Sequence, residues 1–208
     1  MKALHLSMKT SLILLGFMVV FLFMIGNAQA SLVYSLTQGN TALNDAGLQG
    51  PYGTVIINVG SNGTATVDVI MKSPYLVGGP DGGTAAFALN VAGTVPTISS
   101  IVPGSGVTQF FGKTSPVNMD GFGTFNISVY QNSMKPVANL SFILSGGSWT
   151  SEATFTGSGL PVAAHVVGVL PGGARTTGYA SVPVPPSVWL LGAGLLGMVG
   201  IRRRLFRK

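Results

Sequence analysis

Short runs of alternating apolar and polar residues, separated by glycine and asparagine, most constrain the fold of this chain. The clearest example is the pair of runs at residues 54–59 and 64–71, which are joined through Asn62-Gly63. Alternation with a period of two puts apolar side chains on one face of a strand, and Asn-Gly suits a turn that requires positive φ. The pattern predicts an antiparallel hairpin. The side chains expected in its core are Val55, Ile57 and Val59 on the first strand, and Ala65, Val67, Val69 and Met71 on the second.

Similar runs recur through the chain and predict further strands. They lie at residues 32–36, 84–91, 122–130, 137–144, 149–155, 163–170 and 176–181. Long amphipathic helical patterns and repeats of fixed period are absent from the sequence. We therefore expect an all-β fold over residues 31–181, an antiparallel β-sandwich or jelly-roll-like domain. The chain has no cysteine, so packing and backbone hydrogen bonds must stabilise this domain.

The positive charge of the chain is concentrated at its two ends. The formal net charge is +6, but residues 31–181 hold four cations and five acidic residues, a net charge of −1. A nucleic-acid partner needs clustered lysine or arginine. We therefore expect no nucleic-acid binding by the domain.

The N-terminus has the pattern of a secretory signal peptide. Lys2 and Lys9 precede an uncharged apolar stretch at residues 12–25, and Ala28-Gln29-Ala30 follows as an A-x-A cleavage site. The pattern predicts an N-terminal signal helix over residues 1–30, recognised by the secretion machinery and cut by signal peptidase after Ala30. The mature chain would begin at Ser31, and an uncleaved helix is the alternative.

The C-terminus combines prolines, an apolar stretch and a cluster of cations. Pro183, Pro185 and Pro186 keep the backbone extended because proline fixes φ and lacks an amide hydrogen. Residues 188–201 are uncharged and would span about 21 Å as a helix, against a hydrocarbon core of about 30 Å. Five cations follow within residues 202–208. This pattern predicts a short transmembrane helix that holds the membrane weakly or transiently, with its cations in the cytoplasm.

This ending resembles the PEP-CTERM sorting signal of Gram-negative bacteria, which the membrane enzyme exosortase processes. Val184 stands between the prolines in place of the family's glutamate, so the signal is similar to a Val-Pro-x-Pro variant. The resemblance covers residues 182–208 and implies a transient inner-membrane anchor, exosortase as a partner, and a domain released to the cell surface or outside the cell. An ordinary C-terminal tail anchor is the alternative. The matching residues are Val182, Pro183, Pro185, Trp189, Gly192, Gly194, Gly197, Arg202, Arg203 and Arg204.

Residues suited to catalysis are scarce in the domain. His165 is its only histidine and lies within an expected strand, which favours a structural role. Ser148 does not complete the G-x-S-x-G nucleophile motif, because Thr150 replaces the final glycine. We therefore expect no catalytic site and no enzymatic activity.

Signals for a metal or a cofactor are equally weak. The sequence holds no D-x-D-x-D-G loop and no Cys/His cluster, and Asp81 and Asp120, each followed by glycine, are typical of turns. Gly192-x-Gly194-x-x-Gly197 matches the spacing of a dinucleotide fingerprint but does not follow a strand of a βαβ unit. We expect no bound metal and no cofactor.

Two functions are consistent with these patterns. The first is a non-enzymatic surface or matrix protein that associates with exopolysaccharide or biofilm, as the resemblance implies. The second is a carbohydrate-binding adhesin that stacks exposed aromatic side chains on sugars. Candidate side chains for the second function are Trp149, Tyr52, Tyr75 and Tyr179, and core packing is the alternative role for each. A hollow with two exposed aromatics and a nearby Asn or Asp would favour binding.

Overall fold

The structure is a computed structural model that describes residues 31–60, 62–79, 83–103, 110–132, 135–147, 149, 153–156 and 159–183. Contacts divide the chain into residues 1–30 and 31–208, and all described residues belong to the second unit. The expected signal helix, the expected transmembrane helix and the cations at the C-terminus lie outside the described residues. Within the described ranges, no helix has the length and apolar character needed to span a bilayer.

The described residues are mostly β-strand, as the alternating patterns predict. The two helices are short: α2 at Thr41–Asp45 and α3 at Ala153–Thr156. The strands are β1 (Ser31–Leu36), β2 (Gln38–Gly39), β3 (Gly53–Val59), β4 (Thr64–Met71), β5 (Leu76–Val77), β6 (Thr84–Leu89), β7 (Thr97–Pro103), β8 (Phe110–Lys113), β9 (Val117–Met119), β10 (Gly123–Phe125), β11 (Ile127–Gln131), β12 (Asn139–Ser145), β13 (Val162–Val169) and β14 (Arg175–Ser181).

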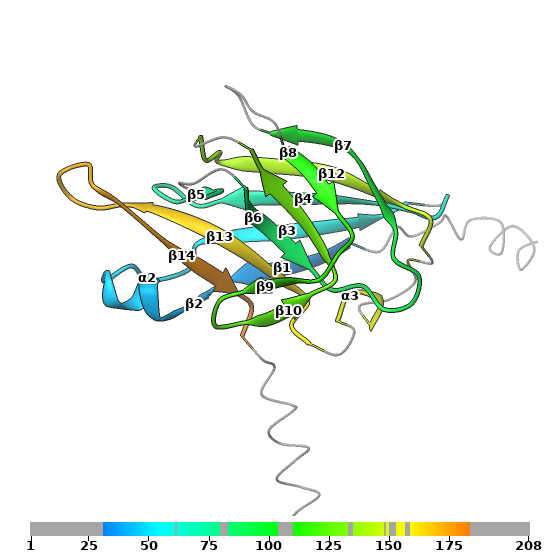
Figure 1. The fold of residues 1–208 in the computed structure, drawn as a ribbon, viewed down its shortest axis with the longest axis horizontal. Coiled ribbons are helices and arrows are strands. Elements are labelled where there is room, and N and C mark those ends of the chain that lie inside the picture. The colour runs from blue at the N-terminus through cyan, green and yellow to red at the C-terminus, as the bar shows by residue number, and fades with distance from the viewer. Residues whose placement is uncertain are drawn as a thin grey trace, which may run out of the picture. The chain divides into compact units, whose positions relative to one another are not determined.

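The strands form two main sheets in which every pair is antiparallel (Figure 1). Sheet A has the order β1-β3-β4-β12-β7, and sheet B has the order β2-β14-β13-β6-β11-β8, with β5 also paired to β13. The small hairpin of β9 and β10 forms a third sheet. The prediction of an all-β antiparallel domain is therefore confirmed.

The two main sheets share one hydrophobic core, which gives the domain a sandwich-like architecture. Phe142 of β12 in sheet A meets Phe87 of β6 in sheet B with ring centroids 5.8 Å apart. Val55 and Ile57 are fully buried, as expected, while Val59 is half-buried. The predicted turn is also confirmed, because Gly63 has a φ of +65°. Burial of such apolar surface supplies the main favourable free energy of folding.

A second, smaller cluster lies on the other side of sheet B. Ala85, Ala88 and Ala163 of the sheet contact Met119 and Phe125 of the β9–β10 hairpin. Since Ala164 and Val166 belong to the main core, alternation along β13 places Ala163 and His165 on the outer side. The hairpin therefore covers part of the outer face of sheet B and leaves the rest for other contacts.

The predicted strand at 122–130 is wrong as a single element. It breaks at Asn126 into β10 and β11, which belong to different sheets. The Asn126 side chain accepts from the Val91 amide at 3.0 Å and donates to the Val91 carbonyl at 2.7 Å. This pairing with backbone interrupts the ladder, so Phe125 packs outside sheet B while Ile127 enters the main core.

The predicted strand at 149–155 is also wrong. Trp149 and Phe155 stack with centroids 5.3 Å apart, whereas an extended strand would separate these residues by about 20 Å at 3.3 Å per residue. The Trp149 Nε1 donates to the Gly63 carbonyl at 2.8 Å, and Phe155 lies in helix α3. Packing of the two rings into the core replaces the expected extended conformation.

Several elements were not expected from the sequence. Strand β7 contains Ser100 at a φ of 51°, and its pairing with β12 shifts register between Ser141 and Ile143. A bulge of this kind interrupts the two-residue period by which a strand is recognised. The other unexpected elements are β2, β5, β8, β9 and helix α2, which are too short to show a period.

Candidate ligand-binding face

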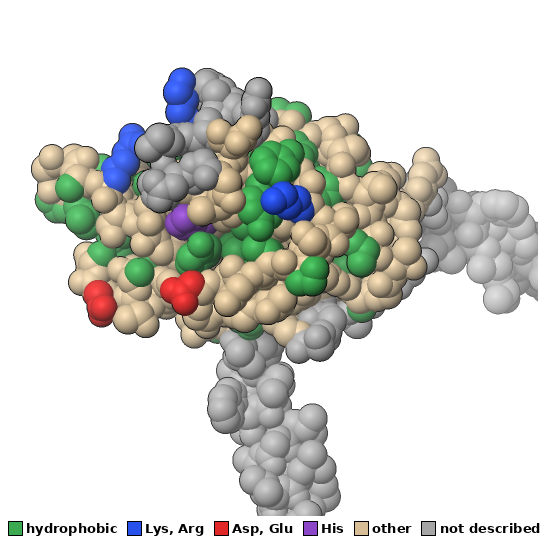
Figure 2. Space-filling view, in the orientation of Figure 1, with side chains coloured by type: hydrophobic (Ala, Val, Ile, Leu, Met, Phe, Trp, Pro, Cys, Tyr) green, Lys and Arg blue, Asp and Glu red, His purple; other side chains and the backbone are tan. Residues whose placement is uncertain are grey.

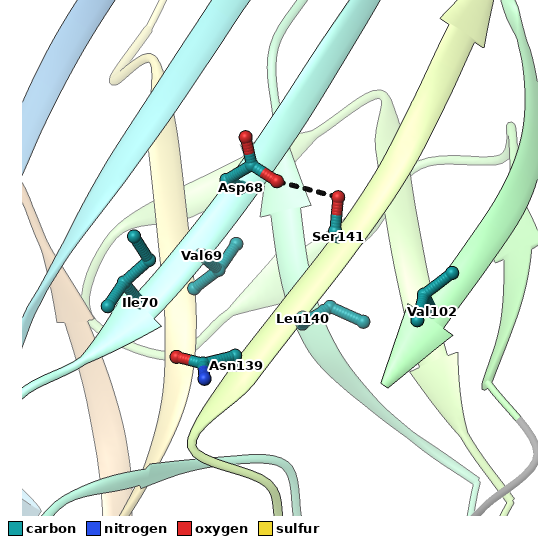
Figure 3. Close-up of a pocket in the computed structure, with 7 residues that line it drawn as sticks. All are labelled: Asp68, Val69, Ile70, Val102, Asn139, Leu140 and Ser141. Carbon is teal, nitrogen blue, oxygen red and sulfur yellow. Dashed lines mark hydrogen bonds between the residues drawn. The ribbon is translucent and has the colours of Figure 1, made fainter. Parts of the chain in front are cut away.

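One pocket lies on the outer face of sheet A, between β4, β12 and β7 (Figure 3). It has a volume of about 420 Å³. Its walls include Ile70 and Val102, whose side chains are 45% and 61% exposed, so it is a shallow surface hollow. Two of its three polar side chains contact each other, because Ser141 Oγ donates to Asp68 Oδ1 at 2.6 Å, and the third, Asn139, is exposed.

That hydrogen bond belongs to a chain of polar contacts across four strands of sheet A. Asn58 Nδ2 donates to Asp68 Oδ2 at 3.5 Å, and Ser31 Oγ donates to Asn58 Oδ1 at 3.0 Å. Cross-strand pairs of this type stabilise a sheet. Because these groups satisfy one another, Asn139 is the polar side chain of the pocket lining that is left to meet a ligand.

The outer face of sheet B presents a different set of side chains. We call the set of Phe111, Lys113, Tyr130, His165 and Tyr179 the aromatic face. Tyr130 and Tyr179 belong to the outer cluster of sheet B, and the strand register places Phe111 beside Tyr130. Figure 2 shows hydrophobic side chains gathered around a cation on one side of the molecule, with a histidine close by.

The aromatic rings of this face form two stacked pairs. Phe111 and Tyr130 have centroids 5.7 Å apart and planes inclined by 23°. His165 and Tyr179, paired across β13 and β14, have centroids 4.5 Å apart and planes inclined by 20°. Strand β6 separates the pairs and places Ala85 opposite Tyr130, so the strands of Tyr130 and His165 lie two spacings, about 10 Å, apart, and those of Tyr130 and Tyr179 lie three spacings, about 14 Å, apart.

Lys113 covers the first ring pair. Its Nζ lies 3.9 Å from the centroid of Tyr130 and 5.4 Å from that of Phe111. An ammonium group over an aromatic ring is attracted to the negative face of the π-system. The side chain is nevertheless exposed to solvent, so a ligand can reach both the cation and the rings.

His165 is packed into the second pair. It is 5% exposed, and its ring lies against Gly79 as well as Tyr179. A Cβ at Gly79 would lie 3.1 Å from both Nδ1 and Cε1 of His165 and closer still to Thr84 Oγ1, so a larger residue at position 79 would force these side chains to shift. His165 lies within strand β13, as expected. Its buried ring stacks on Tyr179 and so helps to hold that ring in place.

A network centred on Asn40 places Asp120 near Tyr179. Asn40 caps helix α2 by accepting from the Leu43 amide at 3.3 Å, and the same oxygen accepts from the Tyr179 amide at 3.1 Å. Its Nδ2 donates to Asp120 Oδ2 at 3.2 Å. Asp120 lies in the turn between β9 and β10, as its sequence context predicted. One buried amide thus joins α2, β14 and the hairpin turn.

The surroundings of Tyr179 keep its hydroxyl protonated. Burial is the main cause of its raised pKa, followed by the negative charge of Asp120 and the nearby Tyr130 hydroxyl. Neither the Tyr179 nor the Tyr130 hydroxyl hydrogen-bonds to another described residue. Both hydroxyls are therefore available to donate to a ligand, beside an Asp120 carboxylate that accepts.

The four aromatic side chains proposed from the sequence lie in different places. Trp149 and Tyr52 are 5% and 1% exposed, so the expectation that they stack on a ligand is wrong. Tyr75 is half-buried, contacts the Tyr52 ring at 5.0 Å and donates its hydroxyl to the Gln49 carbonyl. Only Tyr179 belongs to the aromatic face. Core packing was the stated alternative for Trp149, and it is confirmed.

Sequence reasoning missed Phe111, Lys113 and Tyr130. A signal for the first two was present, because Phe111 and Lys113 are two residues apart and would share one face of a strand. Their meeting with Tyr130 depends on the pairing of β8 with β11, which joins distant parts of the chain. No local pattern indicates that pairing.

The predicted processing sites mostly lie outside the described residues. This holds for Ala28, Ala30, Pro185, Trp189, the glycines at 192, 194 and 197, and the arginines at 202–204. Val182 is 7% exposed and packs against the main core, and Pro183 is exposed. Ser148, Asp81 and the C-terminal G-x-G-x-x-G spacing also lie outside the described part.

Acidic and histidine side chains do not cluster in the described ranges in any group of three that could hold a metal ion. Comparison of the chain with protein families, curated proteins and solved structures found no match. The chemistry of the aromatic face therefore has to be inferred from its own geometry.

Proposed function

We propose that this chain is an exported, non-enzymatic protein of the cell surface or extracellular matrix, and that it binds polysaccharide through the aromatic face. In the unprocessed chain, a signal helix and a transmembrane sorting helix would flank a β-sandwich of jelly-roll-like type. Exosortase would remove the C-terminal helix after transient anchoring in the inner membrane. The domain would then act among exopolysaccharides as an adhesin.

The end of the last described strand supports the export part of the proposal. β14 ends at Ser181, directly before the proline-rich segment, and Val182 and Pro183 follow it outside any strand. β14 lies between β2 and β13 within sheet B. Cleavage after the proline-rich segment would therefore leave every described strand of both sheets in place.

Intact-mass measurement of the protein from the envelope and medium of its native host tests this processing. We expect loss of residues 1–30 and of the segment after the prolines. The variant Pro183→Ala/Pro185→Ala should be processed poorly. A surface protein that still ends at Lys208, or wild-type processing of the variant, would contradict the role of exosortase.

The two stacked ring pairs carry the binding part of the proposal. Sugar rings present apolar C–H faces that pack on aromatic side chains, and hydroxyls that exchange hydrogen bonds with polar groups. The strands of Tyr130 and Tyr179 lie about 14 Å apart, a distance that a short oligosaccharide can span. The hydroxyls of Tyr130 and Tyr179 donate, and the Asp120 carboxylate accepts. This arrangement favours the adhesin over a matrix protein that makes no sugar contact.

Affinity electrophoresis of the purified full chain through gels with a panel of neutral and acidic polysaccharides tests binding. At least one polysaccharide should retard migration, and soluble oligosaccharide of the same composition should reverse the retardation. Unretarded migration in the whole panel, together with no binding to exopolysaccharide extracted from the native host, would contradict the proposal.

A further inference from the structure

We propose that Lys113 makes the aromatic face selective for acidic polysaccharides, whose carboxylate groups it binds. This inference rests on the polysaccharide binding proposed above. According to this inference, Lys113 alone makes the face prefer an acidic polysaccharide to a neutral polysaccharide with the same sugar backbone.

The position of Lys113 over the rings is the first observation. Its Nζ, at 3.9 Å from the Tyr130 centroid, occupies the place where a sugar ring would stack on Tyr130. A neutral sugar must displace the ammonium group and lose the cation–π contact without replacing the charge interaction. Lys113 therefore competes with neutral polysaccharides for the Tyr130 ring and lowers their affinity.

The charge surroundings of Lys113 are the second observation. Among the described residues, no carboxylate forms an ion pair with Lys113, which lies exposed at the end of β8. An acidic sugar that stacks on Tyr130 supplies a carboxylate to the ammonium group it moves. The displaced cation then gains a charge-assisted hydrogen bond, which is stronger than one between neutral groups.

The charges at the two ends of the aromatic face orient the bound polysaccharide. Residues 31–181 have a formal net charge of −1, and Asp120 lies beside the other ring pair, near Tyr179. A ligand carboxylate is repelled at the Asp120 end and attracted at the Lys113 end. The carboxylate-bearing sugar therefore belongs over Tyr130, with a hydroxyl-bearing sugar over Tyr179.

The test compares polysaccharides that differ only in the carboxyl group. The probes are polygalacturonate and alginate, each with its carboxyl-reduced neutral form, measured against the purified full chain by affinity electrophoresis. The variant Lys113→Met should bind the acidic forms about three- to fivefold more weakly, the range of an exposed ion pair. It should bind the neutral forms about twofold more tightly, because the competing cation is gone. The ratio of acidic to neutral affinity thus falls about six- to tenfold.

Two control variants separate position from total charge. Lys72→Met removes one exposed cation from the turn after β4 and should leave the ratio unchanged. Lys113→Arg keeps the charge and should keep most of the selectivity, and added salt should weaken only the acidic forms. Circular dichroism of each variant checks that the domain stays folded.

The outcomes distinguish this inference from the function on which it rests. An unchanged ratio in Lys113→Met, or an equal fall in Lys72→Met, would overturn the role of Lys113 while polysaccharide binding stands. Wild-type protein that binds only neutral polysaccharides would also overturn the inference alone. Failure to bind any polysaccharide would overturn both.

Discussion

The two outer faces of the domain differ in how their polar groups are satisfied. On sheet A, a chain of contacts runs from Ser31 through Asn58 and Asp68 to Ser141, so these polar groups are bonded to neighbours in the same sheet. On sheet B, the hydroxyls of Tyr130 and Tyr179 bond to no described residue, and the Lys113 ammonium lies over rings. The pocket lies on the sheet A face, whereas the hydroxyl and ammonium groups that can donate to a ligand lie on the sheet B face.

This difference shows that a hollow is a weaker sign of a binding site than unsatisfied polar groups beside exposed apolar surface. A ligand entering the sheet A pocket would have to compete with the Ser141–Asp68 hydrogen bond at 2.6 Å. A ligand on the aromatic face would displace the ammonium end of Lys113, which is exposed and lies over Tyr130. Specificity usually comes from a few placed polar groups within an apolar site.

The largest expected effect comes from the core that both faces share. Phe142→Ala removes a ring that contacts Phe87 at 5.8 Å and leaves a cavity between the sheets. Such a substitution costs about 3–5 kcal/mol of unfolding free energy, measured by urea denaturation. The substitution touches neither outer face, so this variant shows how a loss of stability alone affects the binding assays. A loss below about 1 kcal/mol would contradict the shared core.

Removing rings from the aromatic face should give the next largest effect. Tyr130→Ala/Tyr179→Ala should weaken polysaccharide binding at least about fivefold, given roughly 0.5–1.5 kcal/mol for each aromatic contact. The matched control is Ile70→Ala/Val102→Ala on sheet A, which also trims two partly exposed apolar side chains. Titration with retarding polysaccharide measures both. Equal losses in the two variants would remove the distinction between the faces.

Breaking the polar chain of sheet A should affect stability without affecting binding. Ser141→Ala removes the donor to Asp68 and should lower the free energy of unfolding by about 1 kcal/mol. Chemical denaturation measures the stability, and affinity electrophoresis measures the binding. A weakened affinity for polysaccharide in this variant would place ligand contacts on sheet A.

The smallest expected effect is on the titration of Tyr179. Asp120→Asn removes a negative charge that raises the pKa of Tyr179, so the pKa should fall while staying above the ordinary 10.0 because burial is the larger cause. Absorbance of tyrosinate during an alkaline titration measures this pKa. Asp68→Asn on sheet A is the control and should leave the titration of Tyr179 unchanged.

The raised pKa of Tyr179 also has a consequence for stability. The folded state holds this proton more tightly than the unfolded state, so its contribution is complete below pH 10.0 and is lost as the pH rises through the folded pKa. Tyr179→Phe should therefore make alkaline unfolding less steep. An identical pH dependence in the variant and the wild type would contradict the burial of this hydroxyl.

Most strands could be predicted because they show a local period. The runs that became β1, β3, β4, β6, β12, β13 and β14 each alternate over several residues, and their predicted core side chains are largely buried. The runs at 122–130 and 149–155 failed for a common reason. In both, a non-local contact, Asn126 with Val91 and Trp149 with Gly63, stabilises a conformation that the local pattern does not contain.

The aromatic face could be predicted only in part. Tyr179 was among the aromatic side chains expected to bind sugar, and it lies on this face. Trp149 and Tyr52 were expected there too, but both are buried in the core. The residue type alone does not show whether an aromatic ring lies at the surface or in the core. The short strand β8 showed no usable period, so its pairing with β11 was not expected. Two of the five members of the aromatic face, Phe111 and Lys113, come from that strand.

The sequence by itself determined most of the longer strands, the absence of disulfides, and where export and sorting signals are expected, because these depend on neighbours along the chain. Only the tertiary structure decided which side chains share the outer face of sheet B. Phe111, Tyr130, His165 and Tyr179 come from four strands brought together by backbone pairing between residues far apart in sequence. Pairing of that kind depends on the packing of the whole core, which no short stretch of sequence encodes.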